Sequence, residues 1–126
     1  MKANFLSFII VGAGGFLGSM ARYGAGYVVK KFSDHPFPLG TFLINISGCL
    51  LIGILFGLGS RSQLLQGNSW LFWASGFCGG FTTFSTFALD NMDLVHKQLS
   101  FQAILYTILS VALGLLLCRL GIWLGR

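Results

Sequence analysis

Residues 76–87 read Gly-Phe-Cys-Gly-Gly-Phe-Thr-Thr-Phe-Ser-Thr-Phe, inside a segment that is otherwise apolar. Two adjacent glycines followed by two threonines predict a break in a helix here. A break frees backbone N–H and C=O groups that lipid cannot hydrogen-bond, so it is tolerated only against protein, water or an ion. The stretch therefore predicts a membrane helix that is broken in mid-span, where the exposed backbone needs a partner or a function.

The composition of the whole chain is that of an integral membrane protein. Of 126 residues, 55% are hydrophobic and 9% are charged, and the mean hydropathy is +0.80. A soluble domain of this size cannot bury so much apolar surface. A spanning helix needs about 20 mostly apolar residues, and four segments qualify: 5–29, 39–58, 70–94 and 99–122. We therefore predict one all-α transmembrane domain over residues 1–126, with four transmembrane helices per chain and the third helix broken.

Charge and cysteine usage exclude several classes of function. The net charge of +5 comes from cations scattered at the ends of the segments, which is not the pattern of a nucleic-acid-binding surface. The three cysteines match neither a disulfide framework nor a metal-binding spacing, and we interpret them as small buried side chains. No cluster of partnered acids and bases suggests an enzyme.

The basic residues do not select an orientation in the membrane. With four spans, the side that holds both termini carries Lys2, Arg61, Arg119 and Arg126, and the other side carries Arg22, Lys30, Lys31 and Lys97. Since the positive-inside rule counts lysine and arginine in the loops, four against four gives no preference. The balance favours insertion in both orientations and an antiparallel dimer. A chance tie, or one dominant loop, is the alternative.

Small residues spaced four apart predict close helix contacts. They occur at Gly14 and Gly18, Gly53 and Gly57, and Ser110 and Gly114. Such pairs let membrane helices approach closely. Together they favour an oligomer, because four short helices alone cannot enclose a pore on all sides.

Two polar side chains inside the predicted spans need a partner or a function. Arg22 is either a side chain that reaches the interface or a positive charge that draws anions to a vestibule. Asn45 either joins two helices by hydrogen bonds or donates its amide to a passing anion. The sequence leaves both pairs of alternatives open.

The segment after the predicted break carries aromatic and hydroxyl side chains together. Phe81, Phe84 and Phe87 recur every three residues and are expected on adjacent turns, while Thr82 and Thr86 form a hydroxyl row that Ser85 extends. The rim of a phenyl ring is the positive end of its quadrupole, and hydroxyls donate hydrogen bonds. This combination suits an anion that must lose water without being trapped by a fixed charge.

These motifs resemble those of the Fluc (CrcB) fluoride channels. The resemblance rests on the Gly-Gly-x-Thr-Thr-Phe-Ser-Thr-Phe string at 79–87, the glycine-rich stretch that ends at Arg22 and Tyr23, and the segment 40–45. It covers essentially the whole chain. It implies a fluoride-selective channel, not an enzyme, that gives passive fluoride efflux across the bacterial inner membrane. The implied assembly is an antiparallel, dual-topology homodimer with two separate pores, surrounded by membrane lipid.

The resemblance also implies which residues carry the function. Arg22 would line a vestibule, and the fluoride pore would be lined by Asn45, Phe84, Ser85, Thr86, Phe87, Tyr106 and Ser110. A central structural sodium ion, not transported, would bind the backbone carbonyls of Gly79 and Thr82 of both subunits. Asp90 stands where the family leads us to expect a glutamate, so the role of this carboxylate stays open.

Two other functions fit a chain of this length. A small multidrug antiporter depends on a membrane-embedded glutamate in the first helix, and this sequence has no glutamate. A non-transporting assembly subunit is the second alternative, but it would leave the hydroxyls on the broken helix without a purpose.

Overall fold

The structure, a computed structural model, describes residues 2–126. This part of the chain contains helices and no strand. Three helices are long: α1 (Phe5–Phe32), α2 (Leu39–Arg61) and α6 (Ser100–Gly125). Between α2 and α6 lie the 3-10 helix η1 (Gln63–Leu65), α3 (Asn68–Trp70), the π-helix η2 (Leu71–Cys78), α4 (Gly79–Phe81) and α5 (Phe84–His96).

The three long helices are each long and apolar enough to cross a membrane. Their apolar side chains point largely outward: Phe5 is 81% exposed and Trp123 is 70% exposed. An apolar exterior with so small a buried core is unstable in water and suits lipid as the solvent. The sequence therefore correctly predicted an all-helical chain with long apolar helices.

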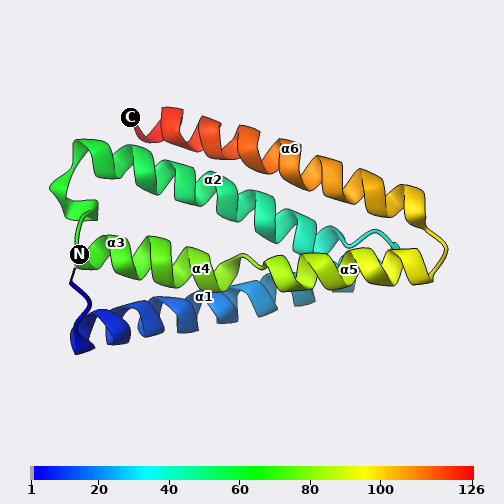
Figure 1. Cartoon of the computed structure of the whole chain (residues 1–126), viewed down its shortest axis with the longest axis horizontal. Coiled ribbons are helices and arrows are strands. Elements are labelled where there is room, and N and C mark those ends of the chain that lie inside the picture. Colours follow the sequence, from blue (N-terminus) through cyan, green and yellow to red (C-terminus); the bar gives the residue numbers. More distant parts are fainter. Residues whose placement is uncertain (1) are drawn as a thin grey trace.

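The chain runs back and forth along one long axis (Figure 1). The short elements from α3 to α5 follow one another in a line beside α1, and α2 lies beside α6. Both termini and the connection 62–67 lie at one end of the molecule, and the connections 33–38 and 97–99 lie at the other.

Glycine contacts hold the two pairs of helices close together. A Cβ on Gly80 would lie 2.5 Å from the carbonyl oxygen of Gly15, and one on Gly57 would lie 2.6 Å from that of Ile122. At Gly18 and Gly53 an added Cβ would meet a backbone carbonyl just as closely. The predicted small-residue pairs at 14/18 and 53/57 are thus used within one chain, so they do not themselves indicate an oligomer.

The helix break begins at Thr82, two residues after Gly80, and so lies beyond the glycines where the sequence placed it. Gly79 and Gly80 are helical, and the chain leaves the helix at Thr82 (ψ 156°) and Thr83 (φ −150°, ψ 124°). The glycines stay helical because Gly80 packs against α1, where a larger side chain would not fit. The prediction of a break was right, but its position at Gly79–Gly80 was wrong.

Candidate functional site

Asn45 holds both polar groups of the Thr83 backbone at the break. Its Nδ2 donates to the carbonyl oxygen of Thr83 at 3.0 Å, and its Oδ1 accepts the N–H of Thr83 at 2.9 Å. The amide of Asn45 thus replaces the neighbouring strand or turn that would normally satisfy extended backbone. Asn45 is therefore a link between α2 and the break, and one of its two N–H groups remains for another acceptor.

Two backbone carbonyls at the break lose their usual helical partners. The N–H of Thr83, four residues after Gly79, donates to Asn45 instead of to the Gly79 carbonyl. The N–H of Thr86, four residues after Thr82, donates to the hydroxyl of Thr83 at 3.3 Å. The carbonyls of Gly79 and Thr82 therefore do not accept the hydrogen bonds that they would accept in a continuous α-helix.

The side chain of Arg22 reaches the break from α1. Its Nε donates to the carbonyl oxygen of Gly80 at 3.0 Å. A charged donor to a carbonyl near the break is a strong hydrogen bond. Arg22 therefore stabilises this backbone, in addition to any effect of its charge on ions.

Three hydroxyl groups lie together at the start of α5. The Oγ1 of Thr83 is 3.2 Å from the Oγ1 of Thr86 and 3.4 Å from the Oγ of Ser85. Thr82 is not part of this group, because its hydroxyl donates to the carbonyl of Cys78 at 2.8 Å. The predicted hydroxyl row through Thr82 and Thr86 is thus wrong in one member: Thr83 takes the place of Thr82.

The aromatic side chains also divide at the break. Phe84 and Phe87 lie with their ring centroids 5.7 Å apart, and Phe87 lies 5.0 Å from Tyr106. Phe81, before the break, stacks instead on Phe77 at 5.9 Å. The expected row of three phenylalanines is therefore a pair, because the extended residues at 82–83 separate Phe81 from α5.

An apolar cavity of about 470 Å³, here called cavity 1, lies along the break. Its lining includes six predicted site residues, namely Asn45, Gly79, Thr82, Phe84, Phe87 and Ser110. None of the described residues that line it is charged. The buried hydroxyl oxygen of Ser110 has no hydrogen-bond partner in the described part of the chain. An unpaired donor in an apolar cavity is costly without a ligand or water, so this group is available to one.

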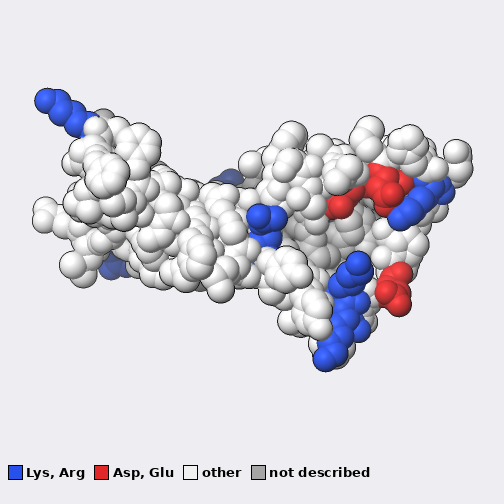
Figure 2. Space-filling model, turned by 90° about the horizontal axis from the view of Figure 1, so that it is seen from below, with Lys and Arg blue, Asp and Glu red and all other residues white. Residues whose placement is uncertain are grey.

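A second, more polar cavity of about 610 Å³, cavity 2, lies between α1, the connection 33–38 and α5. It is lined by charges of both signs, including Arg22, Lys30, Asp90 and Asp93. Figure 2 shows basic groups at both ends of the molecule and acidic groups only at the end with cavity 2. Cavity 2 is therefore lined by charged residues, whereas cavity 1 has none among its described lining residues.

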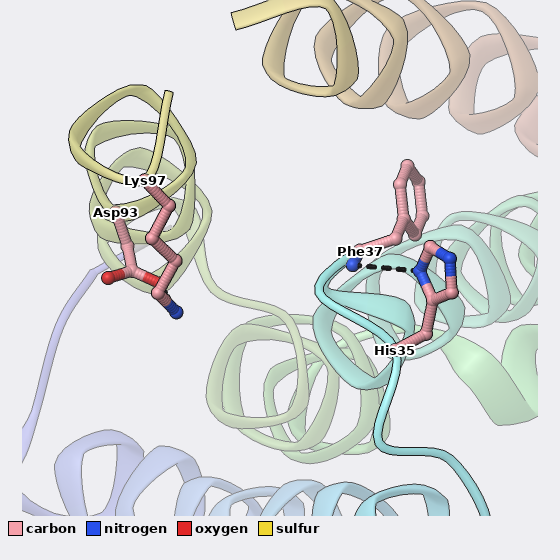
Figure 3. A network of polar contacts seen from close by, with 4 residues as sticks. All are labelled: His35, Phe37, Asp93 and Lys97. Atoms are coloured by element: carbon pink, nitrogen blue, oxygen red, sulfur yellow. Dashed lines mark hydrogen bonds and ion pairs between the residues drawn. The ribbon is translucent and has the colours of Figure 1, made fainter. Parts of the chain in front are cut away.

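Two local contacts flank cavity 2 (Figure 3). The Nδ1 of His35 accepts the N–H of Phe37 at 3.1 Å, and Lys97 Nζ pairs with Asp93 Oδ2 at 2.6 Å. The ion pair is exposed, so it contributes little to stability. Of these four residues, His35, Phe37 and Asp93 line cavity 2.

Comparison with known proteins identifies the family. The family model described as CrcB-like protein, Camphor Resistance (CrcB), matches residues 9–122. The chain belongs to the CrcB family. It is 40% identical over 126 residues to a protein of Prosthecochloris aestuarii named "Fluoride-specific ion channel FluC", covering 100% of this chain and 98% of the relative. A Flavobacterium psychrophilum protein of the same name is 39% identical, covering 92% and 94% of the two chains.

In this CrcB-family chain, the predicted site residues are only partly gathered around the two cavities. Arg22 and Thr86 line cavity 2, while Ser85 and Tyr106 line neither cavity. Ser85 is exposed, and Tyr106 is fully buried with its hydroxyl donating to Asp90 at 3.1 Å. Tyr106 therefore contacts the candidate pathway through Phe87, not through a cavity wall.

Thr83 lines the candidate site although the sequence analysis gave it no role. Thr83 lines both cavity 1 and cavity 2, and no other described residue does so. The sequence did contain a signal for Thr83. Threonine is a favoured N-cap residue, and Thr83 directly precedes α5, where its side chain accepts the N–H of Thr86. Reading the break at the glycines concealed that role.

Proposed function

We propose that the chain is a fluoride-selective channel that gives passive fluoride efflux across the bacterial inner membrane. The observation that carries the proposal is the match over the full length of the chain to relatives named for fluoride channels. Membership of this family also makes the protein a channel and not an enzyme. Net efflux would follow when acid carries HF inward and fluoride accumulates in the less acidic cytoplasm.

The two cavities are the parts of the pathway within one chain. Arg22 and Lys30 in cavity 2 raise the local concentration of anions, while the acids there prevent a deep trap. In cavity 1 an anion meets the rings of Phe84 and Phe87 and the unpaired hydroxyl of Ser110. Ring edges and neutral donors replace part of the water shell without a fixed charge, which permits both entry and exit.

The functional unit in this proposal is an antiparallel, dual-topology homodimer with two separate pores. Phe84 lines cavity 1 yet is 80% exposed in the single chain, so the cavity needs a further wall. The equal numbers of basic residues predicted for the two sides of the membrane, four on each, support insertion in both orientations. A second, inverted copy would supply that wall.

A structural sodium ion fits the backbone at the break. The carbonyls of Gly79 and Thr82 have lost their helical donors, and both residues line cavity 1. Carbonyl oxygens are suitable ligands for a hard cation, and two such carbonyls from each of two subunits would surround it. When bound, the ion would offset the repulsion between carbonyl dipoles that face each other at the dimer axis. Gly79 and Thr82 would hold it without transporting it.

Replacing sodium by a large organic cation should lower dimer stability and, with it, fluoride flux. The reason is that the four carbonyls would then face each other without a counter-charge in a site with little water. Dimer content can be followed by gel filtration in detergent with sodium or N-methylglucamine as the only cation. A dimer equally stable in both solutions would count against the sodium site, while leaving fluoride conduction untouched.

Ion flux from purified protein in liposomes separates this function from the alternatives. A fluoride channel releases fluoride down its gradient, a multidrug antiporter exchanges protons for organic cations, and an assembly subunit moves neither. The absence of glutamate from the chain already disfavours the antiporter.

A further inference from the structure

We propose that the hydroxyl of Thr83 is a permeation residue that passes the anion between cavity 2 and cavity 1. This inference rests on the proposed fluoride channel and adds a residue to its pathway. Thr83 was assigned no role by the sequence motifs, which drew attention to Asn45 and to the residues on either side of it.

The position of Thr83 is the first argument. Cavity 2 has a charged lining, cavity 1 has an uncharged one, and both include residues at the break. Thr83 lines both, so an ion that moves from one cavity to the other passes this residue. Polar side chains continue on both sides: Thr86 lines cavity 2, and Asn45 and Ser110 line cavity 1.

The second argument is that the hydroxyl is the only polar group that Thr83 can offer. Its N–H and its C=O are both bonded to the Asn45 side chain, at 2.9 and 3.0 Å. These two bonds fix the residue in an extended conformation and leave its side chain beside the hydroxyls of Ser85 and Thr86. Asn45 thus acts as a positioning residue, and Thr83 presents the donor.

The third argument comes from the chemistry of the hydroxyl cluster. A hydroxyl rotates about its C–O bond, so Thr83 can turn its proton from a neighbouring hydroxyl toward an anion. Its hydrogen bonds to Thr86 Oγ1 and Ser85 Oγ are long, at 3.2 and 3.4 Å, and are easily exchanged. A neutral, adjustable donor between a charged and an uncharged cavity lowers the cost of removing water without holding the ion.

Thr83 also caps α5, so the test must separate capping from permeation. Thr83→Ser keeps the hydroxyl and the cap. Thr83→Asp keeps the cap, since aspartate is at least as good an N-cap as threonine, but places a negative charge where the anion passes. Thr83→Val keeps the shape of the side chain and removes both the hydroxyl and the cap. Thr107→Val is the matched control. The hydroxyl of Thr107 donates a hydrogen bond to Asn91 Oδ1 at 2.9 Å, and Thr107 lines neither cavity.

The measurement is fluoride efflux from liposomes at slightly alkaline pH, with gel filtration and thermal unfolding for each variant. We expect Thr83→Ser and Thr107→Val to conduct within about twofold of the unmodified protein. We expect Thr83→Asp to unfold at a temperature no lower than that of the unmodified protein. Its fluoride flux should nevertheless be at least about tenfold lower. Thr83→Val should also lose about tenfold in flux while it still elutes as a folded species.

The outcomes are distinct. If Thr83 only caps α5, flux follows stability, and Thr83→Asp conducts like the unmodified protein, which would overturn the proposal. Should the aspartate variant fail to fold, the comparison of valine with serine decides: equal flux in those two variants removes the hydroxyl from the pathway. Absence of fluoride flux from the unmodified protein would instead contradict the proposed function itself.

Discussion

Replacement of Phe84 or Phe87 by isoleucine is expected to lower fluoride flux by at least about tenfold, which equals about 1.4 kcal/mol in the barrier. Isoleucine keeps an apolar side chain of similar bulk but removes the ring quadrupole. Both rings line cavity 1 and their centroids lie 5.7 Å apart, so one ion in the cavity is close to both rings. Volume-conserving apolar substitutions are usually tolerated, so the protein should still fold and assemble.

The stacked pair Phe77 and Phe81 provides the matched control. These rings lie 5.9 Å apart before the break and line neither cavity 1 nor cavity 2. The same change to isoleucine there should leave flux nearly unaltered. If Phe84 and Phe87 merely seal helix contacts, their variants should lose the dimer in gel filtration before they lose flux. Unaltered flux in both isoleucine variants would remove the aromatic mechanism and leave the hydroxyls and Asn45 as the pathway.

Three lysines added to the C-terminus should abolish fluoride flux when this variant is expressed alone. They raise the number of basic residues at the end with the termini from four to seven, against four at the other end. The positive-inside rule then fixes one orientation. Because an antiparallel dimer needs both orientations, a population with a single orientation has no functional assembly.

Co-expression with an oppositely biased copy should restore flux. A suitable partner carries Arg61→Ser and Arg126→Ser, which lowers the number of basic residues at the terminal end from four to two. Three added asparagines serve as the control for the length of the extension. Full flux from the lysine variant alone, with its termini accessible on one side of the membrane only, would exclude the antiparallel assembly.

The helices could be predicted from the sequence because their cause is local. Runs of apolar residues in α1, α2 and α6 have the length that a bilayer requires. The exact position of the break was not predictable in the same way. It depends on the contact of Asn45 with Thr83, 38 residues apart in sequence, and on the close approach of Gly80 to Gly15. Glycine destabilises an isolated helix, but between packed membrane helices it permits contact.

The error in the position of the break carried over to the side chains beyond it. One continuous helix across residues 81–87 would have joined Phe81 to Phe84 and Thr82 to Thr86. The two extended residues instead place Phe81 with Phe77 and bring the hydroxyl of Thr83 to those of Ser85 and Thr86. The π-helix before the break changes the register of the preceding segment as well. Helical periodicity therefore predicted which types of residue lie at the site, but it did not predict correctly which of these residues contact one another.

Efflux of fluoride and chloride from liposomes that contain only the purified protein tests fluoride conduction most directly. Fluoride should leave rapidly once a potassium ionophore balances the charge, and chloride should leave no faster than from protein-free liposomes. Efflux should need no proton gradient, because a channel passes ions down their own gradient. Fluoride retained as in protein-free liposomes, by protein that is folded and inserted, would contradict the account.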